Sequence, residues 1–344
     1  QNNAITTLAG NTGTVSFQDN TGYAIGTVNT VGLTATTAAT LTSTGTVTQS
    51  AAITTPTLTL TGAAGTFTLN GAGNAITTLD ANNTALTALN FKEDSGFAVA
   101  GSNTTGDTTL ESVGGTVTET ALINATGLEL LGAGGTFTLN TQANTITTLA
   151  GNTGTVRFQD NTGFAIGTVT TVGLTTTGNT TLSSTGTVTE SAVITAAGLE
   201  LLGAAGIFTL NTQNNAITTL AGNTGTVSFQ DNTGYAIGTV NTAGLTATTA
   251  ATLTSTNTVT QSAAITTPTL TLTGVAGTFT LNRVNNAITA LDADDTALTA
   301  LAFQDNTGFA VAGSNTTGNT ILSSTGAVTE TAVITAAGLE LLGA

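Results

Sequence analysis

The sequence predicts an all-β protein that winds into a parallel β-helix, and three observations lead to this prediction. Hydrophobic residues make up 39% of the 344-residue chain and charged residues only 6%, which is not the composition of a disordered chain. The chain is rich in Thr, Asn and Gly, with 42 Gly, and these residues disfavour long helices. One motif also returns at a fixed spacing, which is the signature of a repeat architecture.

The repeated motif is Asn-Ala/Thr-Ile-Thr-Thr/Ala-Leu. It begins at Asn3, Asn74, Asn144, Asn215 and Asn286, so the period is nearly constant along the chain. We expect one continuous β-solenoid built from five such repeats, which span residues 1–70, 71–140, 141–211, 212–282 and 283–344.

Within a repeat, apolar side chains alternate with polar ones, as Val15 and Phe17 do on either side of Ser16. Alternation over four to six residues is typical of a half-buried strand. Arg157 takes the place of Ser16 in the third repeat, and Glu129 takes a threonine position in the second, so we expect both to face water. The first repeat offers eight such strands: 5–8, 14–18, 23–28, 32–36, 40–44, 46–50, 57–61 and 66–70.

The aromatic residues keep the same register in every repeat, and we expect them to form the core. They fall into three columns: Phe17, Phe91, Phe158, Phe229 and Phe303; Tyr23, Phe97, Phe164, Tyr235 and Phe309; and Phe67, Phe137, Phe208 and Phe279.

Eight or nine short strands in one repeat fit three turns of three strands each. This predicts coils of about 24 residues and about fourteen coils in the chain. Gln1 and Ala344 both fall within ordinary repeat sequence. We therefore expect a segment of a longer array, or a subunit whose ends stack on its neighbours.

The formal net charge is −15, and only Lys92, Arg157 and Arg283 are basic. Nucleic-acid binding and attachment to an anionic membrane both need clustered cations, so we expect neither partner. No apolar run reaches the ~20 residues of a membrane-spanning helix, so membrane insertion is not expected.

Catalysis is not expected either. The chain has no His or Cys, so it cannot build a Ser-His-Asp or Cys-His arrangement. Glu119, Glu190 and Glu330 recur at one equivalent, outward-facing position, which predicts solvated charges spread along the solenoid rather than a convergent acid–base pair. The sequence therefore predicts no catalytic residues, no cofactor-binding residues and no enzyme.

Without His or Cys, metal binding narrows to hard ions with oxygen ligands, and Ca²⁺ accepts carboxylate and carbonyl oxygens. Asp292, Asp294 and Asp295 form the densest acidic cluster and are the candidate ligands. The Gln-Asp-Asn-Thr-Gly segments could also contribute, although Asp-Asn is ordinary turn chemistry. Five glycosylation-type Asn-X-Thr sequences also occur, at Asn82, Asn103, Asn124, Asn179 and Asn315.

Regular Thr-X-Thr rows suggest a flat face of the kind that ice-binding solenoids use. An ice-binding face needs the same row on every coil, whereas three repeats carry Leu-Glu-Leu-Leu in its place, at 128–131, 199–202 and 339–342. A solvated strand face is the simpler interpretation.

Three segments, NAITTLAGNTGTVSFQDNTGYAIGTV, GLTATTAATLTSTGTVTQSAAI and TLTLTGAAGTFTLN, resemble the repeats of filamentous-haemagglutinin-type exoproteins of the two-partner secretion class. The resemblance implies a right-handed β-helix, a secreted or cell-surface location in a bacterium, and a role in attachment or matrix formation. We expect a structural stalk or filament that associates with itself end to end or laterally. The alternative is a solenoid whose side faces bind glycan, protein or ice.

Overall fold

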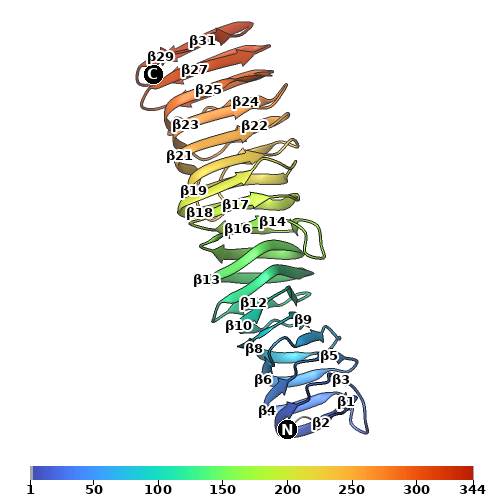
Figure 1. The fold of residues 1–344 in the computed structure, drawn as a ribbon. Helices are drawn as coiled ribbons and strands as arrows, with labels where there is room; N and C mark the ends of the chain where they lie inside the picture. Colours follow the sequence, from blue (N-terminus) through green and yellow to red (C-terminus); the bar gives the residue numbers. More distant parts are fainter. Residues whose placement is uncertain (1–2, 344) are drawn as a thin grey trace. The chain divides into compact units, whose positions relative to one another are not determined.

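The computed structural model describes residues 3–343, and within them every regular element is a strand. The chain forms two units, residues 1–177 and 178–344, and each is a parallel β-solenoid. Together they make about 17 turns of roughly 20 residues. Figure 1 shows the strands of each unit stacked turn upon turn. The predicted fold class is confirmed.

Within residues 3–177, the first unit contains these strands: β1 Thr7–Leu8, β2 Gly10–Gln18, β3 Tyr23–Ile25, β4 Leu33–Thr42, β5 Thr46–Gln49, β6 Ile53–Thr61, β7 Thr66–Leu69, β8 Ala75–Leu86, β9 Ala88–Lys92, β10 Ala98–Thr104, β11 Thr108–Glu111, β12 Thr116–Glu119, β13 Ile123–Asp160, β14 Gly163–Ile166 and β15 Leu174–Thr176.

The second unit contains the remaining strands: β16 Asn179–Ser183, β17 Thr187–Glu190, β18 Ile194–Leu210, β19 Ala216–Gln230, β20 Tyr235–Ile237, β21 Leu245–Thr254, β22 Thr258–Gln261, β23 Ile265–Thr273, β24 Thr278–Leu281, β25 Ala287–Leu298, β26 Ala300–Asp305, β27 Phe309–Thr316, β28 Asn319–Ser324, β29 Val328–Glu330, β30 Ile334–Thr335 and β31 Gly338–Gly343.

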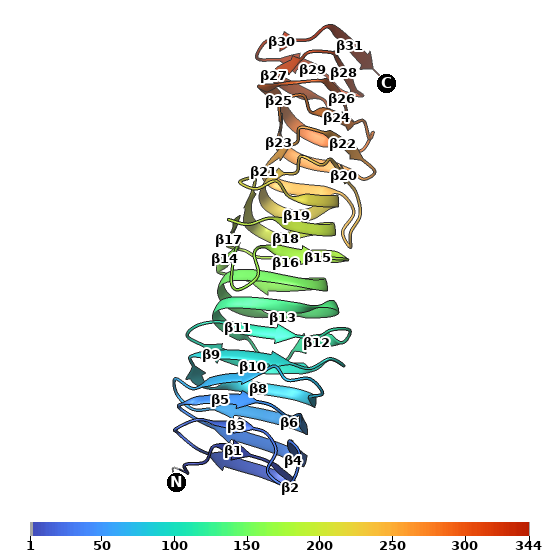
Figure 2. The ribbon, with the colours of Figure 1, turned by 90° about the vertical axis from the view of Figure 1, so that its right-hand side faces the viewer.

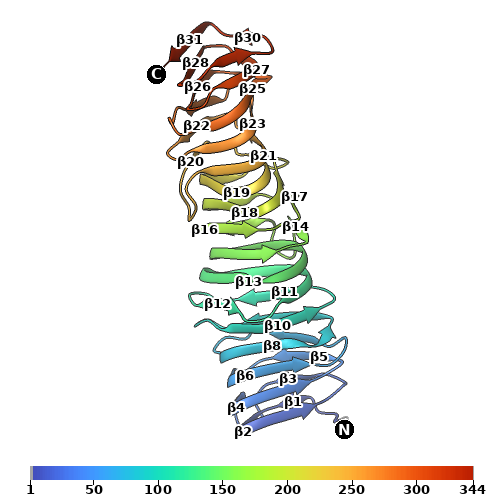
Figure 3. The ribbon, with the colours of Figure 1, turned by 90° about the vertical axis from the view of Figure 1, so that its left-hand side faces the viewer.

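Two parallel ladders run through each unit. In the first unit, β1, β3, β5, β7, β9 and β11 form one ladder, and β2, β4, β6, β8 and β10 form the other. Figures 2 and 3 show these two rows from opposite sides. In the second unit, β20, β22, β24 and β26 alternate in the same way with β21, β23, β25 and β27. Each turn therefore contributes one strand to each ladder.

The turns are shorter than the sequence predicted. Paired residues one turn apart are separated by 17 positions at Thr7 and Ala24 and by 24 at Thr14 and Ala38, and most pairs lie near 20. The long strands bend at a register shift, which in the β4–β6 pairing falls after Thr34. The two strands predicted at 32–36 and 40–44 are therefore the two arms of β4.

Because the turn is shorter, one repeat does not make three whole turns. Val15 of β2 is followed along its ladder by Ala39, Leu58 and Leu79. Leu89, which holds the place of Val15 in the second repeat, lies on β9 of the other ladder. A repeat therefore makes about three and a half turns, and equivalent residues of successive repeats lie on opposite ladders.

The core is formed by the predicted aromatic columns together with Leu, Ile and Val. Phe67, Phe137, Phe208 and Phe279 are completely buried. In every repeat the first two aromatic columns meet edge to face across the interior, with ring centroids 5.0–5.3 Å apart. Burying such a side chain stabilises the fold by roughly 1.5–3 kcal/mol, so the stacked columns hold successive turns together.

Tyr23 and Tyr235 occupy a position where the other repeats have phenylalanine. Both hydroxyl oxygens are buried without a hydrogen-bond partner, and burial raises the pKa of both phenols. An unsatisfied buried hydroxyl costs roughly 1–3 kcal/mol. We expect Tyr23→Phe and Tyr235→Phe each to stabilise their unit by about 1 kcal/mol in urea unfolding. A loss of stability would mean that the hydroxyl is satisfied in solution.

Candidate functional site

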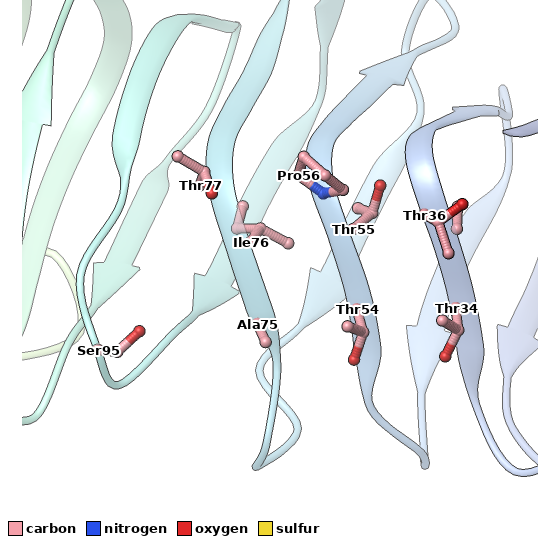
Figure 4. Close-up of a pocket in the computed structure, with 10 residues that line it drawn as sticks. Thr34, Thr36, Thr54, Thr55, Pro56, Ala75, Ile76, Thr77 and Ser95 are labelled. Atoms are coloured by element: carbon pink, nitrogen blue, oxygen red, sulfur yellow. The ribbon is translucent and has the colours of Figure 1, made fainter. Parts of the chain in front are cut away.

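The candidate binding surface is a hollow of about 370 Å³ at the bend of the long strands β4, β6 and β8 (Figure 4). Its floor is a buried row of Ala35, Thr55 and Ile76. Two outward rows flank the floor, and Ser95 lies across from them. The first row contains Thr34, Thr54 and Ala75, and the second contains Thr36, Pro56 and Thr77.

The second unit carries the same hollow at the equivalent positions of the long repeat, with a volume of about 400 Å³. Nine of its ten lining residues are identical, and Thr307 replaces Ser95. Pro268 repeats Pro56, and both prolines lie at the register shift of their strands, where a residue without an N–H is tolerated. The hollow is therefore a built feature of the long repeat.

The chemistry of the hollow is that of a neutral, hydroxylated surface. Its lining residues are Thr, Ser, Ala, Ile and Pro, none of which titrates near neutral pH. Threonine hydroxyls can donate and accept hydrogen bonds, while the threonine methyls and the proline ring offer apolar contact. Such a surface can bind a polyol face but provides no acid or base for catalysis.

Three of the Asn-X-Thr asparagines share one hollow, which was not predicted from their sequence context. Asn82, Asn103 and Asn124 line a depression of about 390 Å³, together with Ser102 and Leu122. The Asn124 Nδ2 donates to Asn103 Oδ1 at 3.0 Å, and Asn82 Nδ2 donates to a backbone carbonyl. The signal was their spacing of 21 positions, which is close to one turn of the observed solenoid.

The threonine rows are short. On the ladder formed by β2, β4, β6 and β8, the outward residues Ser16, Thr40 and Thr59 pair in succession. In the next turn the aligned residue is Asp80. The second unit repeats this order and ends at Asp292. Equivalent residues of successive repeats lie on opposite ladders, so a threonine row of one repeat is not continued on the same ladder by the next repeat.

The aspartates of the Gln-Asp-Asn-Thr-Gly turns have a structural role. Asp19 is fully buried; its Oδ2 accepts the N–H of Ile5 at 2.8 Å, and its Oδ1 accepts the N–H and hydroxyl of Thr21. These hydrogen bonds lower the pKa of Asp19, and the bond from Ile5 makes the largest contribution. Equivalent bonds hold the other three turns, at Asp160, Asp231 and Asp305.

The calcium candidates Asp292, Asp294 and Asp295 lie together on β25, where Asp292 is half-buried and the other two are exposed. Burial, followed by the neighbouring carboxylates of Asp294 and Asp295, raises the pKa of Asp292. Within residues 3–343, no group of three or more acidic side chains has the arrangement of a metal site. Calcium binding at these residues stays a prediction from sequence.

The predicted outward position of Glu119 and Glu190 is wrong. Their exposed fractions are 4% and 6%, and only Glu330, at the same place in the fifth repeat, faces solvent. Each buried Oε1 accepts two backbone N–H groups from the next turn, of Thr141 and Gln142 for Glu119. The burial is possible because these N–H groups replace water around one carboxylate oxygen.

Glu129 was also expected to face water and does not. Its exposed fraction is 2%, because a hairpin at residues 167–173 folds over it. The Thr171 N–H donates to Glu129 Oε1 at 2.6 Å, and Val169 packs against Gly127, where a larger residue would collide. Arg157, in contrast, is exposed as predicted. We call this arrangement the hairpin clasp.

The second unit contains the same clasp over Glu200, which is 1% exposed. Oε1 accepts the Thr242 N–H at 2.6 Å, and Oε2 accepts from Asn241 at 2.7 Å and from Thr181 at 2.9 Å. Burial alone would raise the pKa of Glu200, but these hydrogen bonds outweigh it and lower the pKa.

The clasp has a signal in the sequence. The two Leu-Glu-Leu-Leu segments at 128–131 and 199–202 are each followed, in the next repeat, by a Gly-Thr-Val hairpin, at 167–173 and 238–244. The two Thr-Leu-Thr-Leu segments at 57–60 and 269–272 are each followed by a repeat without one. This pairing within one chain predicts the contact between hairpin and glutamate.

We expect Glu200→Ala to release the clasp by leaving the Thr242 N–H without its partner, at a cost of roughly 1–3 kcal/mol. Because the pKa of Glu200 is lowered, its contribution is present above the ordinary glutamate pKa and lost as pH falls through the folded value. Hydrogen exchange at Thr242 measures both effects. Unchanged protection in the variant would contradict the clasp.

Comparisons of the chain with protein-family models, with curated proteins and with solved structures find no match. In the described part of the chain, no helix is long and apolar enough to cross a membrane. The functional proposal therefore rests on the residues and on their arrangement.

Proposed function

We propose that this chain is a structural segment of a secreted or surface-exposed bacterial adhesin-like protein. Its solenoid units act as a stiff stalk in attachment or matrix formation, and the chain is not an enzyme. The observation that supports this proposal most strongly is the repetition itself. Residues 1–70 and 213–282 differ at three positions, and both carry the same ladders and turn aspartates and six of the ten residues that line the hollow.

The stacked ladders suit this mechanical role. Within each unit, successive turns are joined by parallel backbone hydrogen bonds and by buried apolar columns, so a pulling force is shared over many interactions. The resemblance to filamentous-haemagglutinin-type repeats supports an extracellular location. Association of units end to end or laterally would extend such a stalk into a fibre.

Single-molecule pulling on the chain between its two ends tests the proposal. A stalk predicts repeated resistance as groups of turns unwind, and recovery of that resistance after relaxation. Extension with no resistance would contradict it. Negative-stain microscopy of the purified protein over a concentration series then measures whether copies associate into fibres.

The two matching hollows favour a second candidate function, the binding of neutral glycans along the side of the stalk. The probe is a glycan array with the fluorescently labelled chain. Side-face binding predicts that Thr54→Val combined with Thr266→Val removes the signal, because the variant loses one exposed hydroxyl per hollow. Thr68→Val, an outward threonine outside the hollow, is the matched control. A stalk without side-face binding predicts no signal for any of the three proteins.

A further inference from the structure

One position of the repeat carries an amide side chain in two repeats and a carboxyl side chain in two others. It is Gln49, Glu119, Glu190 and Gln261 in the first four repeats, within otherwise similar Thr-Val-Thr-X segments. Each of these four side chains points to the buried asparagine that opens the following repeat motif. The four repeats therefore provide a comparison of two chemical groups in one environment.

In the glutamine side chain, both Oε1 and Nε2 have hydrogen-bond partners. Gln49 Oε1 accepts the Gly71 N–H at 3.0 Å, and Nε2 donates to Asn74 Oδ1 and, at 2.9 Å, to the Ala51 carbonyl. Asn74 Oδ1 also accepts the Ile53 N–H at 2.8 Å. Gln261 and Asn286 repeat this interaction in the second unit.

In the glutamate side chain, only one of the two carboxylate oxygens has a hydrogen-bond partner. Glu119 Oε1 accepts the N–H of Thr141, as Gln49 Oε1 accepts that of Gly71, so the carboxyl group has the orientation of the amide. Glu119 Oε2 then takes the place of the donating Nε2, and it is buried without a hydrogen-bond partner. Glu190 is bound in the same way by Thr212 and also has an orphan Oε2.

The orientation shared with Gln49 places Oε2 where the amide Nε2 donates to the asparagine Oδ1 and to a backbone carbonyl, and both of these groups are acceptors. Asn144 Oδ1 is held in place by the Ile123 N–H at 2.7 Å, and Asn144 Nδ2 is occupied by the carbonyls of Leu139 and Gln159. Asn215 is fixed in the same manner in the second unit. A buried oxygen facing a fixed acceptor is satisfied only if it carries a proton.

We propose that Glu119 and Glu190 are acid-closed locks: a proton on Oε2 completes the hydrogen bond to Asn144 or Asn215 that glutamine makes permanently in the first and fourth repeats. The second and third repeats thereby become more stable as pH falls, whereas the glutamine positions keep the same strength at every pH.

The surroundings fit a group that titrates without charged neighbours. Glu119 faces Val99 on β10 and Thr141, Gln142 and Asn144 on β13, and Glu190 faces Thr212, Gln213 and Asn215. None of these side chains titrates, and no charged side chain is among the groups that shift either pKa. Burial, the largest cause, raises the pKa of both carboxyls. It outweighs the hydrogen bonds to their charged form, which include one from the side chain of Asn144 or Asn215.

The sign of the pH effect follows from this direction. A group whose folded pKa lies above its unfolded value contributes its stability fully below the unfolded pKa, about 4.3 for glutamate, and loses it as pH rises through the folded value. The two locks therefore close as pH falls through the folded pKa and open as pH rises above it. Asp19 and Glu200 act in the opposite direction, so the effect must be measured as a difference between variants.

The experiment compares thermal unfolding of the full chain, Glu119→Gln/Glu190→Gln and the reverse variant Gln49→Glu/Gln261→Glu, between about pH 4.5 and 8. The Glu-to-Gln variant is expected to unfold roughly 2–5 °C above the parent at the alkaline end, with the gap closing toward the acid end. The reverse variant is expected to fall below the parent at the alkaline end and to approach it in acid. A gap that is the same at every pH would overturn the proposal.

A second measurement does not depend on the variants folding well. Carbon-13 NMR of the parent chain with labelled glutamate carboxyls gives the titration midpoints directly, and the Glu-to-Gln variant assigns the two signals. Midpoints above the ordinary glutamate value support the locks. Midpoints at or below that value would show that Oε2 is charged and satisfied by water, and would overturn them.

Discussion

Phe229→Asp is expected to unfold the turns around β19, at a cost of roughly 4 kcal/mol or more. The ring is fully buried between Leu210 on one turn and Leu253 on the next, and it packs edge to face on Tyr235. Truncating a buried Phe costs roughly 3–5 kcal/mol, and a carboxylate in the same place adds an unpaired charge. Urea unfolding with hydrogen exchange on β18, β19 and β21 measures the loss.

Arg157→Ser is the matched control for this prediction. Arg157 is exposed on the outer face, and serine is the residue that the first and fourth repeats carry at the same place, as Ser16 and Ser228. The expected change is within about 0.5 kcal/mol. Similar unfolding midpoints for the Phe229 and Arg157 variants would contradict the assignment of inner and outer positions.

Gly132→Ala is expected to disrupt the tight turn that joins two arms of β13, at a cost of roughly 2–4 kcal/mol. Gly132 has a φ of 117°, and a Cβ atom there would lie 2.0 Å from the Ser112 carbonyl oxygen of the preceding turn. Both the backbone conformation and the contact exclude a side chain. Thermal unfolding is the measurement.

Gly114→Ala is the control, because it lies one turn away and a Cβ atom there meets nothing within 4 Å. It should leave the unfolding midpoint nearly unchanged. If the two alanine variants were equally stable, successive turns could not approach each other as closely as the structure places them.

The sequence predicts those features that repeat with the strand period. The alternation places the core correctly. Val15 and Phe17 are half-buried, and the other members of the aromatic columns are buried as expected. The turn length could not be derived in the same way, because the repeat period fits three longer turns as well as three and a half shorter ones. Assuming a whole number of turns per repeat led to the longer coil.

Burial of acidic residues was missed for a different reason. Glu129 occupies an outward strand position, and Thr171 of the hairpin that covers it comes 42 positions later in the chain. Glu119 replaces Gln49 at a position where the amide already bonds inward to an asparagine. In both cases the deciding contact is between turns, so a pattern read along a single strand does not contain it.

The candidate hollow was missed as well, because it depends on where the long strands bend. The strand predicted at 57–61 begins earlier, because β6 extends from Ile53 to Thr61 and bends at Pro56. The bend separates Thr34 and Thr54 from the rest of the face and leaves the depression between the two rows. Composition predicts a threonine-rich surface, whereas its concave shape follows from the register shift.

Cysteine cross-linking tests the stacking of turns most directly, since the chain has no cysteine of its own. Thr40 and Thr59 are outward partners on β4 and β6, and neighbouring strands lie about 4.8 Å apart, within disulfide reach. The account predicts that Thr40→Cys/Thr59→Cys forms an intramolecular disulfide under mild oxidation and that Thr40→Cys/Ala64→Cys does not. A cross-link in the second pair but not in the first would support coils of about 24 residues and contradict the register of β4 and β6.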